Sequence, residues 1–412
     1  MSGINFVKRV ATGWVTSLLL AAAINSPVAA QEKVRPEVGK PLQAASDLMR
    51  TSKFKEALAK IREADAVGGK TPYETYMIES MKGSAAAGAR DNAAAIAAFE
   101  AVLATGKAPA ATQQKIYESL AITYYGMGKY AEAIKYANKF KESGGAGGAM
   151  RTLMIQSYFQ SGDYAASAKE SLADIQADEK AGKPPAEEKL QLLANSYLRQ
   201  KNTTGYVATI EKLLTYYPKK SLWQDIISRL QQKPGFSDRF ALDVQRLRLA
   251  TGNLSATNDF MEMAQLAIQA GYATEGKKIV DDGFAAGALG KGNDAERHKR
   301  LRDLADKRVA ESKATIDKDL AEAKAAKDGN ALVRLGYFFV TAGEGQKGVA
   351  LIEEGIAKGG LKRPEDAKLY LGMAQVQAGS KAKGIATLKS VKGTDGIADL
   401  ANLWALFAQQ KG

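Results

Sequence analysis

The chain has 412 residues, with 58 basic and 45 acidic side chains, one histidine and no cysteine. The lack of cysteine excludes disulfides, thiol nucleophiles and zinc–thiolate sites, and a single histidine leaves little material for acid–base or metal chemistry. We therefore expect no catalytic residues, no metal site and no cofactor, and a protein that is not an enzyme.

The first 30 residues have the pattern of a secretion signal. Lys8 and Arg9 precede a mostly apolar run, and the segment ends in Val28-Ala29-Ala30. The apolar run is shorter than the roughly 20 residues that span a membrane. Small residues at the end suit signal peptidase, so the sequence predicts cleavage after Ala30 and no integral membrane span afterwards. An uncleaved N-terminal anchor is the alternative.

Removal of this segment takes away Lys8 and Arg9 and no acid, which leaves 56 basic and 45 acidic residues and a net charge of +11. Such a charge suits an acidic protein partner or a weak contact with an anionic wall or lipid surface, and it also serves solubility alone. Outside the cytoplasm no nucleic acid partner is expected. Residues 31–37 are expected to form a flexible N-terminus.

A short phrase then recurs along the chain. Residues 128–136 read Gly-Lys-Tyr-Ala-Glu-Ala-Ile-Lys-Tyr, and the same shape returns at 52–58 and 162–168. The small residue in the middle of the phrase stands at Ala57, Ala95, Ala133, Ser167, Gly276, Gly348 and Gly384. The first three intervals are 38, 38 and 34 residues. This spacing is typical of stacked helical hairpins.

Each phrase follows a segment that has small and apolar residues at helical spacing, such as Leu120, Ala121 and Tyr124. Small residues let the two helices of a hairpin approach closely, and Gly128, Gly162, Gly343 and Gly379 are expected to end first helices in left-handed geometry. The chain resembles the tetratricopeptide repeat family over roughly residues 38–290 and 329–395. The resemblance implies an all-α, right-handed α-solenoid of about eight or nine hairpins.

The pattern changes near residue 293. A stripe of Leu301, Ala305, Val309, Ser312, Ile316, Leu320 and Ala323 predicts one long helix over residues 293–327, or two helices broken near Ser312. We expect a first repeat array over residues 38–290, a long charged helix or spacer over 291–328, and further repeats with a capping helix over 329–412. His298, among Arg297, Lys299 and Arg300, is expected to be exposed on this helix.

The first helices of such hairpins line the concave side of a solenoid. Counting from the packed positions places these residues in a partner-binding groove: Tyr125, Gln156, Phe159, Gln160, Gln191, Asn195, Arg199, Gln224, Ser228, Gln231, Gln265 and Gln269. Amides can donate to and accept from an extended peptide, and aromatic rings supply anchors. The alternative is a plain hydrated helix face. The lysine-and-asparagine clamp of chaperone-binding family members is not reproduced here.

The whole chain is also similar to periplasmic repeat proteins of Gram-negative bacteria, some of which occur beside TonB-type energy-transduction components. The resemblance implies a periplasmic scaffold or adaptor that binds an envelope protein or peptide, associated with TonB-type energy transduction. A cell-wall or outer-membrane assembly factor that binds anionic envelope components is the alternative.

Overall fold

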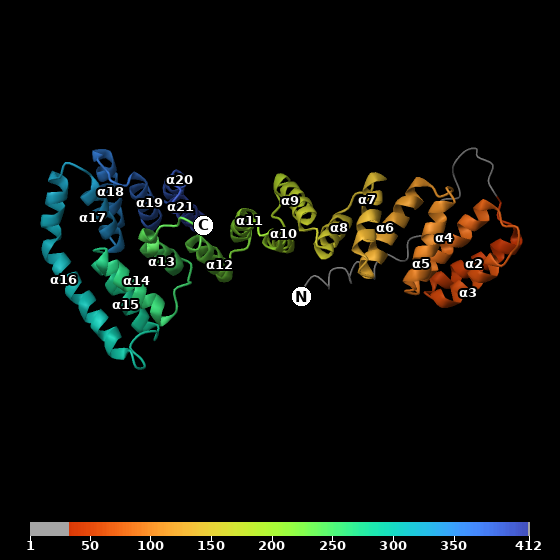
Figure 1. Cartoon of the computed structure of the whole chain (residues 1–412), viewed down its shortest axis with the longest axis horizontal. Coiled ribbons are helices and arrows are strands. Elements are labelled where there is room, and N and C mark those ends of the chain that lie inside the picture. Colours follow the sequence, from red (N-terminus) through yellow and green to blue (C-terminus); the bar gives the residue numbers. More distant parts are fainter. Residues whose placement is uncertain (1–32, 411–412) are drawn as a thin grey trace. The chain divides into compact units, whose positions relative to one another are not determined.

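The computed structural model describes residues 33–410, and within them the chain consists of helices joined by short turns, with no β-strand (Figure 1). This confirms the predicted all-α fold of repeated hairpins. The predicted signal segment lies outside the described residues. Two compact units divide between residues 174 and 175.

Unit 1 is built from consecutive helix pairs. Its helices are α2 (Pro36–Arg50), α3 (Phe54–Asp65), α4 (Pro72–Gly88), α5 (Asn92–Ala104), α6 (Ala110–Gly126), α7 (Tyr130–Glu142) and α8 (Gly148–Ser161), and α9 (Tyr164–Lys180) crosses the boundary. Helix α2 packs on α3, α4 on α5, and α6 on α7, and α2 also contacts α4, as α6 contacts α8. The buried faces form two hydrophobic clusters, around Ile61 and around Leu120.

The recurring small residues lie where the helices of a pair are closest. Ala57, Ala95 and Ala133 have no exposed surface, and neither has Ser167. Gly128 follows α6 with a φ of +73°, and Gly162 follows α8 with a φ of +88°, a backbone region that favours glycine. The repeat phrase therefore marks the start of second helices, as the sequence predicts.

Unit 2 continues with the same pairing. Its helices are α10 (Glu187–Arg199), α11 (Thr203–Tyr216), α12 (Lys220–Gln231), η1 (Asp238–Phe240), α13 (Ala241–Ala250), α14 (Thr257–Gln269), α15 (Ala273–Ala285), α16 (Ala295–Ala325), α17 (Asn330–Thr341), α18 (Gly345–Lys358), α19 (Pro364–Gln377), α20 (Lys381–Lys389) and α21 (Ile397–Gln410). The backbones of α17 and α18 approach each other closely. A Cβ on Gly336 would stand 2.7 Å from the Gly348 carbonyl oxygen.

Helix α16 is a single helix of 31 residues, about 46 Å long at 1.5 Å per residue. The prediction of one long helix is confirmed, and there is no break at Ser312. Leu301, Ala305 and Ala323 are buried, whereas Val309 and Ile316 in the middle of the same stripe are only partly buried.

The expectation for His298 is wrong. Its side chain is 3% exposed, and its Nδ1 accepts a hydrogen bond of 3.1 Å from the backbone N–H of Gly290. The residue faces the turn that leads into α16 because it lies on the same side of the helix as the buried Leu301, three residues later. Its cationic sequence neighbours are exposed.

Within unit 2 the last helices return to helices formed far earlier in the chain (Figure 1). The ring of Trp223 on α12 packs edge-on against Phe407 on α21, at 6.2 Å between centroids. The Gln410 amide donates to the Leu214 carbonyl at 2.7 Å, and the Asn402 amide donates to Glu211 at 2.8 Å. Helix α21 thus covers α11 and α12 as well as the last hairpin. The sequence-based division into two arrays and a spacer stays a prediction.

Candidate partner-binding face

Helix α6 presents two different sides. Ile116, Leu120 and Tyr124 are buried in the core of unit 1. On another side, Glu118, Ile122 and Tyr125 are only partly buried, and their spacing of four and three residues places them on one stripe. Ile122 and Tyr125 also pack against the core cluster.

Helix α8 repeats this arrangement. Thr152, Gln156 and Phe159 follow the same four-and-three spacing and are partly buried. The Tyr125 hydroxyl donates a hydrogen bond of 3.1 Å to Oε1 of Gln156, so the two stripes meet. We call the surface formed by Glu118, Ile122, Tyr125, Gln156 and Phe159 the α6–α8 face.

Each aromatic ring of this face packs against a second aromatic ring. Tyr125 packs edge-on against Tyr130 with 5.6 Å between centroids, and Phe159 packs edge-on against Tyr164 at 5.3 Å. Burial raises the pKa of Tyr125, so its hydroxyl stays protonated and remains a donor at neutral pH. Rings fixed in this way lose little conformational freedom when a partner covers them.

Glu118 differs from the other groups of the face because its carboxylate has no polar partner. Among the described residues it makes no hydrogen bond and no ion pair, whereas Glu100 on α5 accepts from the hydroxyls of Tyr124 and Tyr136 at 3.1 and 2.7 Å. Burial raises the pKa of Glu118, and the nearby Lys115 opposes that shift. The sequence analysis missed Glu118 and Ile122, although their spacing from Tyr125 already placed them on its stripe.

The other predicted groove residues are distributed as follows. Gln160 is exposed at the end of α8, next to Phe159. The remaining ones lie on α10, α12 and α14 of unit 2. They are exposed, except for the partly buried Gln265: Gln191, Asn195, Arg199, Gln224, Ser228, Gln231, Gln265 and Gln269. The Gln191 amide donates to Glu187 on its own helix at 2.7 Å. Of the predicted residues, the structure joins Tyr125 to Gln156, and the role of the whole set in one groove stays a prediction.

Unit 2 also contains a buried charged cluster. The Arg246 guanidinium contacts Asp243 at 2.7 Å and Glu275 at 2.6 Å, and lies 4.7 and 4.6 Å from the ring centroids of Tyr272 and Tyr337. Burial raises the pKa of Asp243 and raises that of Tyr272 to about 12. The side chains of Arg246, Asp243 and Tyr337 are almost fully buried. This cluster therefore joins α13, α15 and α17 and offers no surface to a partner.

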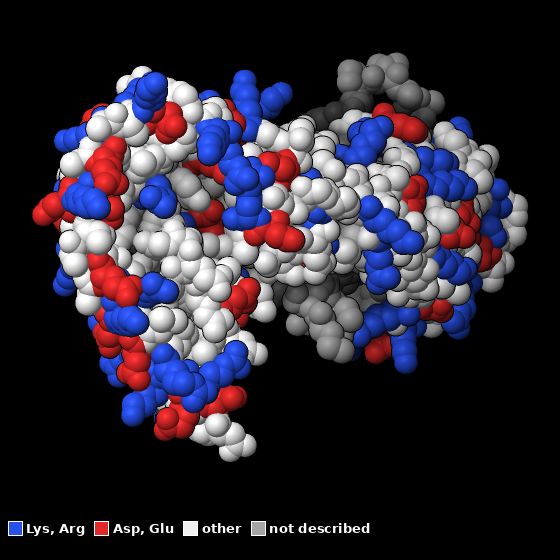
Figure 2. All heavy atoms as spheres, turned by 60° about the vertical axis from the view of Figure 1, so that its left-hand side comes forward, with Lys and Arg blue, Asp and Glu red and all other residues white. Residues whose placement is uncertain are grey.

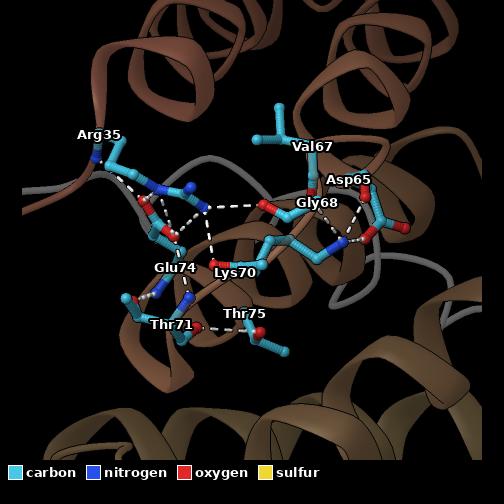
Figure 3. A network of polar contacts seen from close by, with 9 residues as sticks. Arg35, Asp65, Val67, Gly68, Lys70, Thr71, Glu74 and Thr75 are labelled. Carbon is cyan, nitrogen blue, oxygen red and sulfur yellow. Dashed lines mark hydrogen bonds and ion pairs between the residues drawn. The ribbon is translucent and has the colours of Figure 1, made fainter.

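A second polar network ties together the start of unit 1 (Figure 3). The Arg35 backbone N–H and guanidinium donate to Glu74 at 2.9 to 3.3 Å, and the guanidinium also reaches the Gly69 carbonyl. Glu74 and Thr71 form a capping box at the start of α4. These bonds lower the pKa of Glu74 to about 2, with the Arg35 side chain as the largest cause.

Two further features of the described residues bear on function. No group of three or more His, Asp or Glu side chains in residues 33–410 is arranged to hold a metal ion. In the same range, no helix combines the length and the apolar character that crossing a membrane requires.

Comparison with known proteins gives distant structural similarities. No family model matches the chain, and no curated protein does. Among solved structures, the TPR domain of P58(IPK) is similar at 12% identity with a TM-score of 0.22, over 91% of this chain and 99% of that one. Yeast Tom70 is similar at 12% identity with a TM-score of 0.20, over 91% of this chain and 96% of that one.

Proposed function

We propose that the protein is a periplasmic scaffold of the tetratricopeptide type that holds a segment of another envelope protein on the α6–α8 face. The observation that carries this proposal is the state of that face. Tyr125 and Phe159 are laterally fixed and yet partly exposed, and polar groups stand between and beside them.

The chemistry of the face suits a peptide better than a small molecule. Fixed aromatic side chains are typical anchors of protein interfaces. The Gln156 amide and the exposed Gln160 amide can both donate to and accept from a backbone. The face extends over two neighbouring helices, as binding of a short segment of chain requires.

The location rests on the N-terminal sequence, where Lys8 and Arg9, an apolar run and Ala30 form the secretion pattern. We expect the mature protein to begin at Gln31 and to appear in the periplasmic fraction. N-terminal sequencing of the protein recovered from that fraction checks this. A mature chain that still carries residues 1–30 would contradict it.

The binding role is tested by cross-linking in the intact envelope. A photoreactive residue at position 160 is expected to capture a partner, and one at the exposed Lys141 on α7 serves as the matched control. The double variant Tyr125→Ala with Phe159→Ala is expected to abolish capture at position 160 while its circular dichroism remains that of a helical protein. Equal capture by the double variant would refute the proposed face. Mass spectrometry of the captured protein also tests the predicted link to TonB-type components.

The net charge of +11 after signal removal favours a second candidate role, in which the protein binds anionic envelope components. On the face of unit 2 seen in Figure 2, basic and acidic side chains are interspersed rather than gathered in one patch. This face therefore offers no single basic patch to an anionic surface. Sedimentation with purified wall material separates the two roles, since wall binding predicts retention that disappears at high salt.

A further inference from the structure

The carboxylates of unit 1 differ in whether they have polar partners. Most of those that are buried or partly buried have partners: Glu74 accepts from Arg35, and Glu79 pairs with Lys82. Glu118 is partly buried on the α6–α8 face and makes no hydrogen bond or ion pair with any described residue. The face therefore presents a carboxylate whose acceptor capacity is unused.

Such a carboxylate favours a cationic ligand. Its burial by α6 and its neighbours already disfavours the charged form, as the raised pKa of Glu118 indicates. A cation placed beside it gains more Coulomb energy than it would from a fully hydrated carboxylate, and adds a charge-assisted hydrogen bond. Among the described residues, Lys115, one turn earlier on α6, is the charge that lowers the pKa of Glu118, and it forms no ion pair with Glu118.

The distance from this carboxylate to the aromatic anchor fixes a spacing. Glu118 and Tyr125 are seven residues apart on one helix stripe, which corresponds to about 10 Å along the axis at 1.5 Å per residue. An extended peptide rises about 3.3 Å per residue. A side chain that reaches Glu118 and one that packs on Tyr125 are therefore about three positions apart in a bound segment that runs along α6.

We propose that the α6–α8 face recognises a protein segment in which a lysine or arginine stands three positions from a large apolar residue. The basic side chain pairs with Glu118, and the apolar one packs between Tyr125 and Phe159. This inference rests on the proposed function, because it names the partner chemistry of the same face.

The test uses the mature chain of residues 31–412 and fluorescein-labelled eight-residue peptides in a Gly-Ser background. One peptide carries Lys and Phe three positions apart, and its counterpart carries Glu in place of Lys. Fluorescence anisotropy at low salt is expected to show at least about tenfold tighter binding of the Lys peptide. Glu118→Gln is expected to abolish that preference, and Glu118→Lys to reverse it. Glu132→Gln, on the exposed start of α7, is the matched control and should bind like the wild type.

The outcomes separate this inference from the proposed function. If Glu118→Gln keeps the Lys preference, or if the wild type binds both peptides equally, the inference is overturned. In that case loss of partner capture by the Tyr125→Ala, Phe159→Ala double variant still supports the binding face. If the double variant also captures its partner normally, both the inference and the proposed function fall.

Discussion

Helices α6 and α8 of unit 1 and helix α17 of unit 2 have different surroundings, although their hairpins are packed by the same means. In unit 1, Tyr125 and Phe159 on first helices remain partly exposed. In unit 2, Tyr337 on α17 is fully buried, because Tyr272 and Arg246 from earlier helices pack against it. Stacked hairpins thus leave a face open or fill it, according to whether the chain folds back onto itself.

The fold-back of unit 2 has two visible causes. Helix α16, about 46 Å long, separates α15 from α17, whereas short turns join most other consecutive helices. The Arg246 cluster then joins α13 to α15 and α17, and α21 closes on Trp223 of α12. Among the described residues of unit 1, nothing comparable covers the α6–α8 face.

The largest effect is expected when Arg246 is removed. In Arg246→Met, the buried Asp243 and Glu275 lose their counter-charge, and unit 2 should lose about 3–5 kcal/mol of unfolding free energy. Trp223 and Trp404 both belong to unit 2, and Trp14 lies in the predicted signal, so tryptophan fluorescence during urea unfolding reports this unit.

The control for this prediction is Arg248→Met. Arg248 pairs with Asp259 at 3.0 Å but is partly exposed, so its loss should lower stability by about 1 kcal/mol or less. If both variants have the same urea midpoint, then the Arg246 cluster does not hold unit 2 closed.

A smaller loss is expected from Gly336→Ala at the close approach of α17 and α18. The added methyl group would stand 2.6 Å from Ile352 and 2.7 Å from the Gly348 carbonyl, so the helices must separate at a cost of about 1–3 kcal/mol. Gly148→Ala in the first turn of α8 meets no atom within 4 Å and should leave stability unchanged or raise it slightly. Thermal unfolding of both variants, followed by circular dichroism, checks the difference.

Local pattern was sufficient to predict most of the fold. The small residues at Ala57, Ala133 and Gly348 sit at helix contacts, and the stripe from Leu301 to Ala323 forms one helix, because these features depend on spacing along the chain. Of the candidate site, the positions of Tyr125 and Gln156 on neighbouring stripes followed from the same counting.

The fold-back of unit 2 was not predicted, because it depends on contacts between residues far apart in sequence. Periodicity tells which side of a helix is buried, but not which distant helix covers it. One signal was available: residues 335–340, in the second half of α17, are apolar all round, as is typical of a helix covered on every side. In α13, by contrast, the buried Asp243 and Arg246 look like ordinary surface residues in the sequence.

Low pH should destabilise the first hairpins of unit 1, where Glu74 lies. Glu74 has a native pKa of about 2, below its usual 4.5, because it accepts from Arg35 and Thr71. Its contribution to stability is therefore present above about pH 4.5 and is lost as the pH falls from there toward 2. Tyrosine near-ultraviolet circular dichroism of the mature chain in the Trp223→Phe, Trp404→Phe background follows both units during this titration, and the difference between this background and its Arg35→Ala variant reports the contribution of Glu74. Arg35→Ala should weaken the acid dependence, and an unchanged titration would contradict the assignment.

The smallest expected effect, and the most informative for the face, is that of Glu118→Gln. A carboxylate that is partly buried without a partner does not stabilise the fold, so its neutral amide should leave the stability of unit 1 unchanged or raise it by a few tenths of a kcal/mol. Glu100→Ala removes the acceptor of two tyrosine hydroxyls and should lower stability by about 1 kcal/mol. Urea unfolding followed by tyrosine fluorescence in the tryptophan-free background compares the two. A loss in Glu118→Gln as large as that in Glu100→Ala would mean that Glu118 has a structural partner in solution and is not free to bind a cation.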